Sequence, residues 1–517
     1  MASGTRVQLS VNGSQVEVVS DLSLLEALRD IGLHSPKDGC SPQGQCGCCT
    51  VSVDGQPRVA CVTPVRRVAG REVTTLEGFD ADVREQWADT FVACGASQCG
   101  FCTPGIVVRL EGLRAKGVAA DDESAVEQAL LAHLCRCTGW RTIVEAYARF
   151  GTPVPGGRDL EAASRRASVE GGVLQRVSPD VVTGEAGFAD DTAPGDALVA
   201  VPDGHGGWAV GESLHDARAA SGKVQGRRTT AEARHPLSVP NGNWALTLQT
   251  SWVEPAYLET DASWCVPGGE PASPLGNGGA FGGKSSSVAP GVARQLADEH
   301  GRPVRVLLSR EDAVRMGAKR PPIAAGMGVD GSGVVRVVAT PGIVETIKAV
   351  APALVVEEVA VPGPPTSTAP RGAGWAEAVV LLAGARGEVG RVTAPNGAMA
   401  EAAIDLGGRV RVWVSCGEVL DEIVLRSYCI GAAHMALGLV TSEQVTVDES
   451  GDAQDLTIRS FGVLRANQTP PIDVELDASA SGEPVNGSDA VFAAVAAAMW
   501  LHQGCPPSWP TGRPVRA

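Results

Sequence analysis

The sequence lacks any dense run of lysine or arginine, and its acidic residues outnumber its basic ones. Across 517 residues, 59 Asp and Glu stand against 43 Lys and Arg, which gives a formal net charge of −16 at pH 7. Proteins that hold nucleic acid or an anionic membrane by charge present basic patches instead. The composition therefore argues against both partners, and the acidic balance is typical of a soluble protein.

Long hydrophobic runs are lacking as well. The N-terminal segment MASGTRVQLSV has no apolar core of a signal peptide. The apolar stretch 491–501 is shorter than the about 20 residues that cross a bilayer. We therefore expect a cytoplasmic protein without a membrane partner. In that compartment, the fourteen cysteines favour metal ligation over disulfides.

Eight cysteines within the first 140 residues form two groups of four. The first quartet is Cys40, Cys46, Cys49 and Cys61, and the second quartet is Cys99, Cys102, Cys135 and Cys137. Four thiolates at loop-like spacings suit an iron–sulfur cluster or a zinc ion. The spacing of Cys40, Cys46 and Cys49 is close to the plant-ferredoxin pattern, and Cys135-x-Cys137 is too tight for an ordinary zinc knuckle. Two [2Fe–2S] clusters are therefore predicted, with structural zinc as the alternative.

Hydrophobic periodicity indicates an α+β multidomain chain. Residues 6–19 alternate as a β-hairpin around Asn12-Gly13, whereas residues 80–150 contain stretches with helical spacing. Glycine and proline then mark a linker. The predicted divisions are 1–78 for a small α+β unit, 79–152 for a helical unit, 153–180 for the linker, and 181–345 and 346–517 for two mixed α/β portions.

Four motifs in the first 150 residues resemble the iron–sulfur domains of the molybdenum hydroxylases, the xanthine oxidase and aldehyde oxidoreductase family. They are GCSPQGQCGCCTV, ACVTP, QCGFCTPG and LCRCTGW. The resemblance implies a β-grasp [2Fe–2S] ferredoxin domain followed by a four-helix-bundle [2Fe–2S] domain. Five residues separate Cys40 from Cys46 where the family usually has four. Cys48 stands where the family usually has alanine, so it is left out of the ligand set.

The later chain resembles the molybdenum subunit of this family in pieces. The segments VTGEAGFADD, NGGAFGGK and APRGAGWAEA resemble the start of its first domain, its glycine-rich cofactor loop and its active-site RGxG loop. This implies that 181–345 and a shortened 346–517 are molybdopterin-binding-like. The residues it places at a molybdenum–molybdopterin cofactor are Gln98, Cys137, Gly278, Gly279, Phe281, Gly282, Arg371 and Gly372. Taken alone, NGGAFGGK is more typical of a mobile hairpin.

A catalytic base is implied in the same way. In the family, a glutamate in a GEP segment before a helix near the C-terminus acts as the base. This role carries over to Glu483, with Asp489 as the alternative, and Arg371 is the other candidate catalytic residue. The competing interpretation of Glu483 is a solvated side chain in a turn.

These features together predict a molybdenum-dependent hydroxylase or dehydrogenase. It would oxidise a small N-heterocycle or aldehyde-type substrate with water as oxygen donor and pass electrons through both clusters. The sequence shows neither a flavin domain nor a GQGxH-type cofactor segment. An FAD-binding partner subunit and an oligomeric assembly are therefore expected. Either the chain holds a pared-down cofactor domain or a further molybdenum subunit completes it. The alternative is an electron-transfer subunit whose C-terminal part is a non-catalytic docking scaffold.

Overall fold

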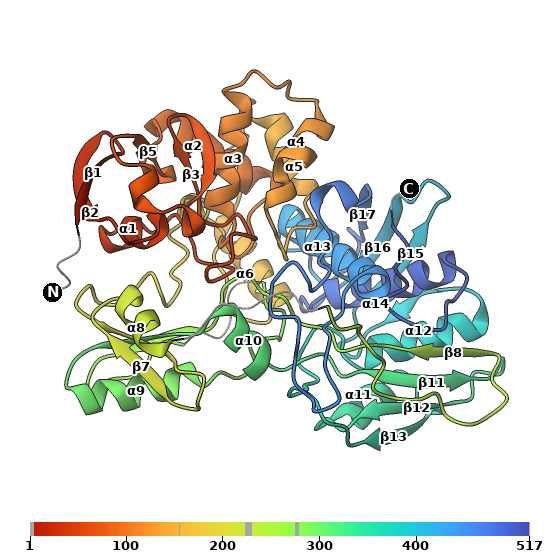
Figure 1. The fold of residues 1–517 in the computed structure, drawn as a ribbon. Coiled ribbons are helices and arrows are strands. Elements are labelled where there is room, and N and C mark those ends of the chain that lie inside the picture. Colours follow the sequence, from red (N-terminus) through yellow and green to blue (C-terminus); the bar gives the residue numbers. More distant parts are fainter. Residues whose placement is uncertain (1–4, 155, 223–229, 274–278, 516–517) are drawn as a thin grey trace.

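The computed structural model describes residues 5–515 except 155, 223–229 and 274–278. It is a mixed α/β multidomain fold. In Figure 1 the first 150 residues lie above two lobes formed by the later chain. The arrangement places the cysteine-rich units against both lobes.

The first unit is built on a five-stranded sheet with the order β2-β1-β5-β3-β4. Its elements are β1 (Arg6–Val11), β2 (Ser14–Val19), α1 (Leu24–Asp30), β3 (Thr50–Val53), β4 (Gln56–Val59), β5 (Glu72–Thr74) and the 3-10 helices Ala60–Val62, Val65–Arg67 and Leu76–Gly78. Asn12 and Gly13 have φ values of 50° and 77° and form the β1–β2 turn. Ser23 and Glu26 form a capping box that starts α1. The cysteine loop between α1 and β3 is thus fixed at both ends.

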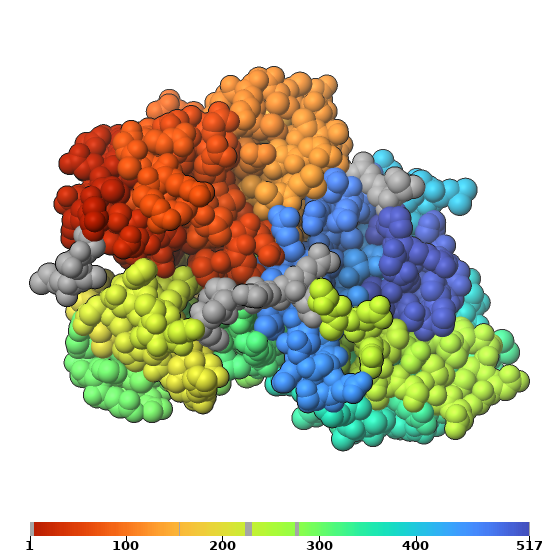
Figure 2. Space-filling model, viewed as in Figure 1, coloured from red at the N-terminus to blue at the C-terminus, as the bar shows by residue number. Residues whose placement is uncertain are grey.

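The second unit is helical. It contains α2 (Ala81–Cys94), α3 (Thr103–Arg114), α4 (Glu123–Ala129), the 3-10 helix Leu130–Ala132 and α5 (Arg141–Arg149). The fully buried Trp87 packs its ring 4.3 Å from that of Phe150 and 5.9 Å from that of Phe91. Both units share one hydrophobic core. They accordingly form one continuous body, red and orange in Figure 2.

The third portion centres on a four-stranded sheet with the order β7-β6-β10-β9. Its elements are β6 (Leu198–Pro202), β7 (Trp208–Gly211), α8 (Leu214–Ser221), β9 (Ala262–Cys265), α9 (Ala289–His300) and β10 (Val304–Leu307). Ala293, Leu296 and Ala297 of α9 are buried with the strand residues. One sheet face is thereby covered by the amphipathic helix.

The last portion packs two four-stranded sheets and several helices around one core. Its elements are β8 (Leu246–Gln249), α10 (Arg310–Met316), β11 (Ile323–Met327), β12 (Gly333–Val338), α11 (Ile343–Lys348), β13 (Val355–Val359), α12 (Trp375–Arg386), β14 (Val392–Thr393), β15 (Met399–Ile404), β16 (Val410–Ser415), α13 (Glu422–Thr441), the 3-10 helix Ala466–Gln468, β17 (Ile472–Leu476) and α14 (Ser488–His502). The sheet orders are β13-β12-β11-β8 and β14-β15-β16-β17. Helix α14 contacts both α12 and α13. Its alanines are almost all buried, so neighbouring helices approach it closely.

Helix α13 has the length and composition of a membrane span, with a mean hydropathy of 1.6 over its most apolar window. However, 89% of that window is buried inside the protein. It contacts α6, α14 and β17. A helix that is apolar all round is expected at the centre of a large core, and this is where α13 lies.

The predicted linker, residues 153–180, differs in the structure because it contains a helix with one buried face. Helix α6 (Leu160–Gly171) begins at Asp159, whose side chain accepts the Ala162 N–H at 3.0 Å, and α7 (Pro179–Thr183) follows. Ala163 and Ala167 pack against Tyr428 of α13. The charged sequence of α6 suggests exposure, but two of its charges are paired inside the protein.

Those two charges belong to Arg166 and Glu170, which are 0% and 1% exposed. Arg166 Nη1 lies 3.3 Å from Glu170 Oε1, and the guanidinium also donates to the carbonyls of Val419 and Val485 at 3.0 Å each. Glu170 in turn accepts the N–H of Ser488 at 2.9 Å, at the start of α14. Burial raises the pKa of Glu170, against the opposing effect of Arg166. The pair therefore ties α6 to both neighbouring segments.

We predict that Arg166→Leu destabilises the protein by about 3–5 kcal/mol, because it leaves the buried Glu170 carboxylate unpaired. Thermal unfolding monitored by circular dichroism measures the effect. The matched control is Arg165→Leu, since Arg165 is the exposed neighbour and its loss should cost no more than about 0.5 kcal/mol. Equal melting temperatures for the two variants would contradict a structural role for the pair.

Candidate functional site

The first quartet lies in the loop between α1 and β3 and in the 3-10 helix after β4. All four cysteines are buried, at 1%, 1%, 1% and 5% exposure in chain order. Backbone N–H groups of Gln43 and Gln45 donate to Cys40 Sγ at 3.2 and 3.4 Å, and the Cys61 N–H donates to Cys49 Sγ at 3.4 Å. Hydrogen bonds from Cys46 and Cys61 hold the pKa of Cys40 well below its usual value. The loop thus favours a thiolate at Cys40, while the same contacts raise the pKa of Cys46 and Cys61.

The second quartet gathers the turn before α3 and the segment before α5. Cys137 Sγ lies 3.7 Å from Cys99 Sγ. Cys102 and Cys137 hydrogen-bond Cys135, and these bonds hold the pKa of its thiol well below its usual value. All fourteen cysteines are free thiols. The structure therefore brings each predicted quartet together with no competing disulfide.

The two quartets adjoin each other. The N–H of Leu134, next to Cys135, donates to the carbonyl of Cys46 at 2.9 Å. His133 Nε2 lies 3.1 Å from Thr50 Oγ1. Gly105 in α3 packs so closely that a Cβ there would lie 2.5 Å from the Gly47 carbonyl oxygen. Only backbone without a side chain fits at this contact.

The second quartet is also bound to the later chain by a buried ion pair. Arg136, between two quartet cysteines, places Nη2 2.8 Å from Glu443 Oε2, and its Nε donates to the Pro255 carbonyl at 2.9 Å. The two side chains are 4% and 2% exposed. A Cβ on Gly431 of α13 would lie 1.7 Å from the Cys137 carbonyl oxygen. Helix α13 therefore rests directly on this loop.

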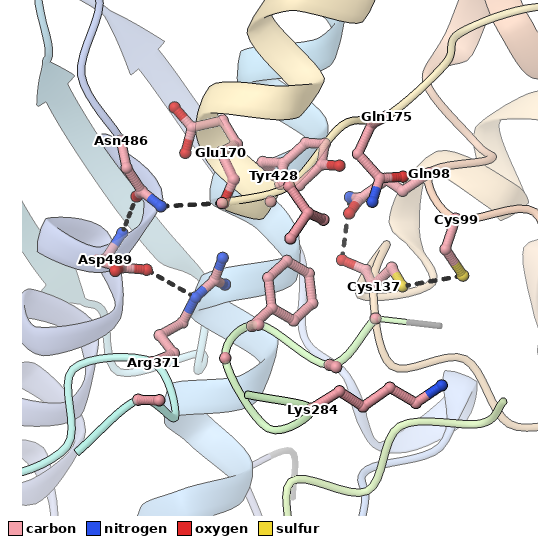
Figure 3. Close-up of a pocket in the computed structure, with 18 of the residues that line it drawn as sticks. Gln98, Cys99, Cys137, Glu170, Gln175, Lys284, Arg371, Tyr428, Asn486 and Asp489 are labelled. Atoms are coloured by element: carbon pink, nitrogen blue, oxygen red, sulfur yellow. Dashed lines mark hydrogen bonds and ion pairs between the residues drawn. The ribbon is translucent and has the colours of Figure 1, made fainter. Parts of the chain in front are cut away.

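A cavity of about 380 Å³ opens where the second quartet meets the lobes. Figure 3 shows Gln98, Cys99 and Cys137 on one side and Asp489, Asn486 and Glu170 on the other, with Tyr428 between them and Arg371 and Lys284 below. The Gln98 amide nitrogen donates to the Cys137 carbonyl at 3.1 Å and to Ser427 Oγ at 3.0 Å. Its buried Oε1 has no protein partner. A hydrogen-bond acceptor is thus available beside the second quartet.

The structure brings most of the predicted cofactor residues to this cavity. Gln98, Cys137, Gly279, Phe281, Gly282 and Arg371 line it. Gly372 follows Arg371 but is not in the lining, and Gly278 lies outside the described residues. A Cβ on Gly282 would lie 1.8 Å from the Ala369 carbonyl oxygen, so the glycine-rich loop and the RGxG loop meet backbone to backbone.

The two candidate bases occupy different places. Glu483 is exposed and does not line the cavity, so the structure does not bring it to the site. Asp489 in the first turn of α14 does line it, with Oδ1 2.9 Å from Arg371 Nε. Burial raises the pKa of Asp489, and Arg371 opposes that shift. The Glu483 backbone instead packs against Gly417, where a Cβ would lie 2.2 Å from the Glu483 carbonyl oxygen.

Arg371 is held from two sides. Its guanidinium carbon lies 4.0 Å from the centre of the Phe281 ring, and its Nη2 donates to Ser488 Oγ at 2.9 Å. Stacking on an aromatic face and a fixed hydrogen bond restrict the orientation of the fork. The cavity floor is consequently a rigid cation paired with one carboxylate.

Sequence reasoning missed Glu170, Tyr428 and Asn486 in the cavity wall. Glu170 falls in the predicted linker, and Tyr428 falls in a helix with no motif. The side-chain carbonyl oxygen of Asn486 accepts the Asp489 N–H at 3.0 Å. An Asn-Gly pair before an apolar helix is a recognisable helix start, so Asn486 could have been found as a capping residue.

Comparison with known proteins assigns the chain to a family. Residues 4–78 match the model of the 2Fe-2S iron-sulfur cluster binding domain, and residues 75–148 match that of the [2Fe-2S] binding domain. One nicotinate dehydrogenase subunit of Pseudomonas putida is 38% identical over 149 residues, which are 94% of that protein and 28% of this chain. The chain belongs to the molybdenum hydroxylase family. This family member thus carries two [2Fe–2S] domains.

Other relatives differ in how much of their length is shared. The iron-sulfur-binding subunit of the xanthine dehydrogenase of Escherichia coli is 36% identical, covering 89% of that protein and 27% of this chain. The xanthine dehydrogenase of Emericella nidulans is 39% identical over 166 residues, but the chain spans only 12% of its length. The similarity therefore supports an oxidoreductase family through the iron–sulfur part.

The similarity of fold to known structures covers more of this chain than the similarity of sequence to the relatives above. An aldehyde oxidoreductase structure from Desulfovibrio desulfuricans matches with a TM-score of 0.67 and 16% identity, over 96% of this chain and 97% of that one. The aldehyde oxidoreductase from Desulfovibrio gigas gives 0.63 and 15%, over 95% and 97%. The later lobes accordingly share an aldehyde oxidoreductase-like fold.

We predict that His133 makes the protein less stable in acid. Burial, with the charge of Arg109, lowers the pKa of His133 from 6.5 to about 3. Between these values the unfolded chain binds the extra proton, so stability falls by a few kcal/mol as the pH drops through this window.

Melting temperatures from pH 7.5 to 4.5 measure this dependence. His133→Gln should flatten it, whereas the control His502→Gln, which alters an exposed histidine, should leave it unchanged. An unaltered slope in His133→Gln would show that other groups cause the acid sensitivity.

Proposed function

We propose that this chain is a molybdenum hydroxylase or dehydrogenase component acting on a small N-heterocycle or aldehyde-type substrate, with water as oxygen donor. The observation that carries this proposal is that Cys99 and Cys137 of the second quartet form a wall of the cavity. A cofactor held in the cavity would lie beside two ligands of the second cluster, which would keep the path for electron transfer short. The first quartet, joined to the second through Leu134 and Cys46, is the next step outward.

We assign one cluster to each quartet, in a β-grasp unit and a four-helix unit. The ligands are Cys40, Cys46, Cys49 and Cys61 for the first cluster and Cys99, Cys102, Cys135 and Cys137 for the second. Within the described ranges, no three His, Cys, Asp or Glu side chains are grouped to hold one metal ion. In each quartet one thiol contacts two others, Cys40 with Cys46 and Cys61, and Cys135 with Cys102 and Cys137. The ferredoxin-like spacing of the first quartet and the tight Cys135-x-Cys137 spacing favour clusters with two irons over single tetrahedral zinc ions.

The cavity residues fit a flat, polar cofactor. Gln98 presents an unpaired acceptor, and the glycine-rich loop offers backbone at Gly279 and Gly282, both with positive φ. Gln98, Cys137, Gly279, Phe281 and Arg371 would hold the molybdenum–molybdopterin cofactor, with Gly278, Gly282 and Gly372 completing the two loops. When bound, that cofactor supplies the two-electron oxidation chemistry. The chain provides orientation and hydrogen bonds.

Proton transfer in the cavity falls to Asp489 in this proposal. It is the carboxylate that faces Arg371, and burial raises its pKa above that of an ordinary aspartate, which favours proton uptake. Glu170, the other lining carboxylate, is occupied by Arg166 and the start of α14. Arg371 would hold an anionic or carbonyl group of the substrate or cofactor through its fixed fork.

The ion pair between Asp489 and Arg371 favours a second candidate function. Because Asp489 is bonded to Arg371 and Glu483 lies outside the cavity, the chain can serve as an electron-transfer subunit with a docking scaffold. Both functions require partners. An FAD-binding subunit would accept the electrons, and a further molybdenum subunit would complete a larger cytoplasmic oligomer.

Metal analysis separates the two functions. We expect the protein purified with its co-expressed partners to contain about four Fe, two per cluster, and about one Mo per chain. Four Fe without Mo or pterin would reject the hydroxylase and leave the electron-transfer subunit.

Paired variants test the base. Asp489→Asn should lower kcat by about 100-fold or more, the usual contribution of a general base, with Fe and Mo contents unchanged. Glu483→Gln should stay within about twofold of the parent, since its side chain is exposed. If Glu483→Gln lost activity and Asp489→Asn kept it, Glu483 rather than Asp489 would be the general base.

A further inference from the structure

A fifth buried sulfur lies against the first quartet. Cys48 is 0% exposed, and its Sγ lies 3.9 Å from the Cys46 carbonyl oxygen. A Cβ on Gly39 would lie 3.2 Å from Cys46 Sγ and 3.2 Å from Cys48 Sγ. The two sulfurs therefore share the space left by the missing side chain of Gly39.

Cys48 also faces the helical unit. Its carbonyl oxygen would lie 2.8 Å from a Cβ on Gly105, so the first turn of α3 rests on its backbone. The Cys46 side chain hydrogen-bonds the Cys48 thiol, which also lies near Cys40 and Cys49 of the first quartet and Cys135 of the second. The Cys46 carbonyl that it contacts is the same one that accepts the Leu134 N–H. Cys48 thus lies at the junction of the two quartets.

The contacts assign the ligand role to Cys49 rather than to Cys48. Cys49 Sγ accepts the N–H of Cys61 at 3.4 Å, which places it beside another quartet member. The Cys48 thiol instead hydrogen-bonds the Cys46 thiol and lies 3.9 Å from the Cys46 carbonyl oxygen. A thiol is a weak donor, and donors near cluster sulfurs set reduction potentials.

We propose that Cys48 is a non-ligand positioning residue that raises the reduction potential of the first cluster and so favours electron flow from the second cluster to the first. Reduction adds one negative charge to the cluster. An S–H directed at the Cys46 sulfur stabilises that charge, and the side chains of both cysteines are buried. The inference rests on the two [2Fe–2S] clusters and not on the molybdenum site.

The test is a redox titration of the purified holoprotein followed by electron paramagnetic resonance. We expect Cys48→Ala to shift the first cluster to a more negative potential while iron stays at about four per chain. Cys48→Ser should restore the parent potential or raise it, because a hydroxyl is a stronger donor than a thiol. The second cluster should shift less. A Cys61→Ser variant identifies which signal belongs to the first cluster.

The matched control is Cys94→Ala, which removes another buried thiol, 2% exposed, from the end of α2. It should leave both potentials unchanged. Iron falling to about two per chain in Cys48→Ala would make Cys48 a ligand and overturn the proposal. Full iron with an unshifted potential would overturn it equally. Absence of Mo would affect neither readout, so failure of the hydroxylase proposal is distinguishable.

Discussion

The buried ion pair between Arg136 and Glu443 is the interaction on which the relation of the iron–sulfur units to the later chain depends. It joins a loop between two cysteines of the second quartet to the end of α13, in a place where both charges are nearly inaccessible. Such a pair costs desolvation and is stable only when its remaining donors are bonded. Arg136 meets this condition through the Pro255 carbonyl. The ion pair consequently fixes the position of the second quartet relative to the cavity.

A similar use of buried charge recurs across the molecule. Arg29 of α1 places Nη1 3.0 Å from Asp191, and Lys37 bonds the same carboxylate, so the first unit is joined to the third portion. Arg166 and Glu170 do the same for α6 and α14. Each pair orients two segments distant in sequence. These charge pairs fix the relative positions of the segments that they join, because hydrogen bonds and ion pairs are directional and apolar contacts are not.

Besides these ion pairs, the structure requires glycine at several points where the backbones of two segments touch. Gly431 meets the Cys137 carbonyl, Gly105 meets residues 47 and 48, and Gly282 meets Ala369. A side chain at any of these positions would separate the parts that it joins. Gly105 keeps the two iron–sulfur units in contact, Gly431 brings α13 against the second quartet, and Gly282 brings two cavity loops together.

The sequence by itself determined the two quartets, the Asn12-Gly13 hairpin and the helical unit, because short-range spacing and turn chemistry carry them. It also indicated two of the loops that line the cavity. Only the tertiary structure decided that one face of α6 is buried, that Asp489 rather than Glu483 faces the cavity, and that Cys48 lies between the quartets. These facts depend on which distant segments neutralise a charge or leave room for a backbone, and no local pattern encodes that.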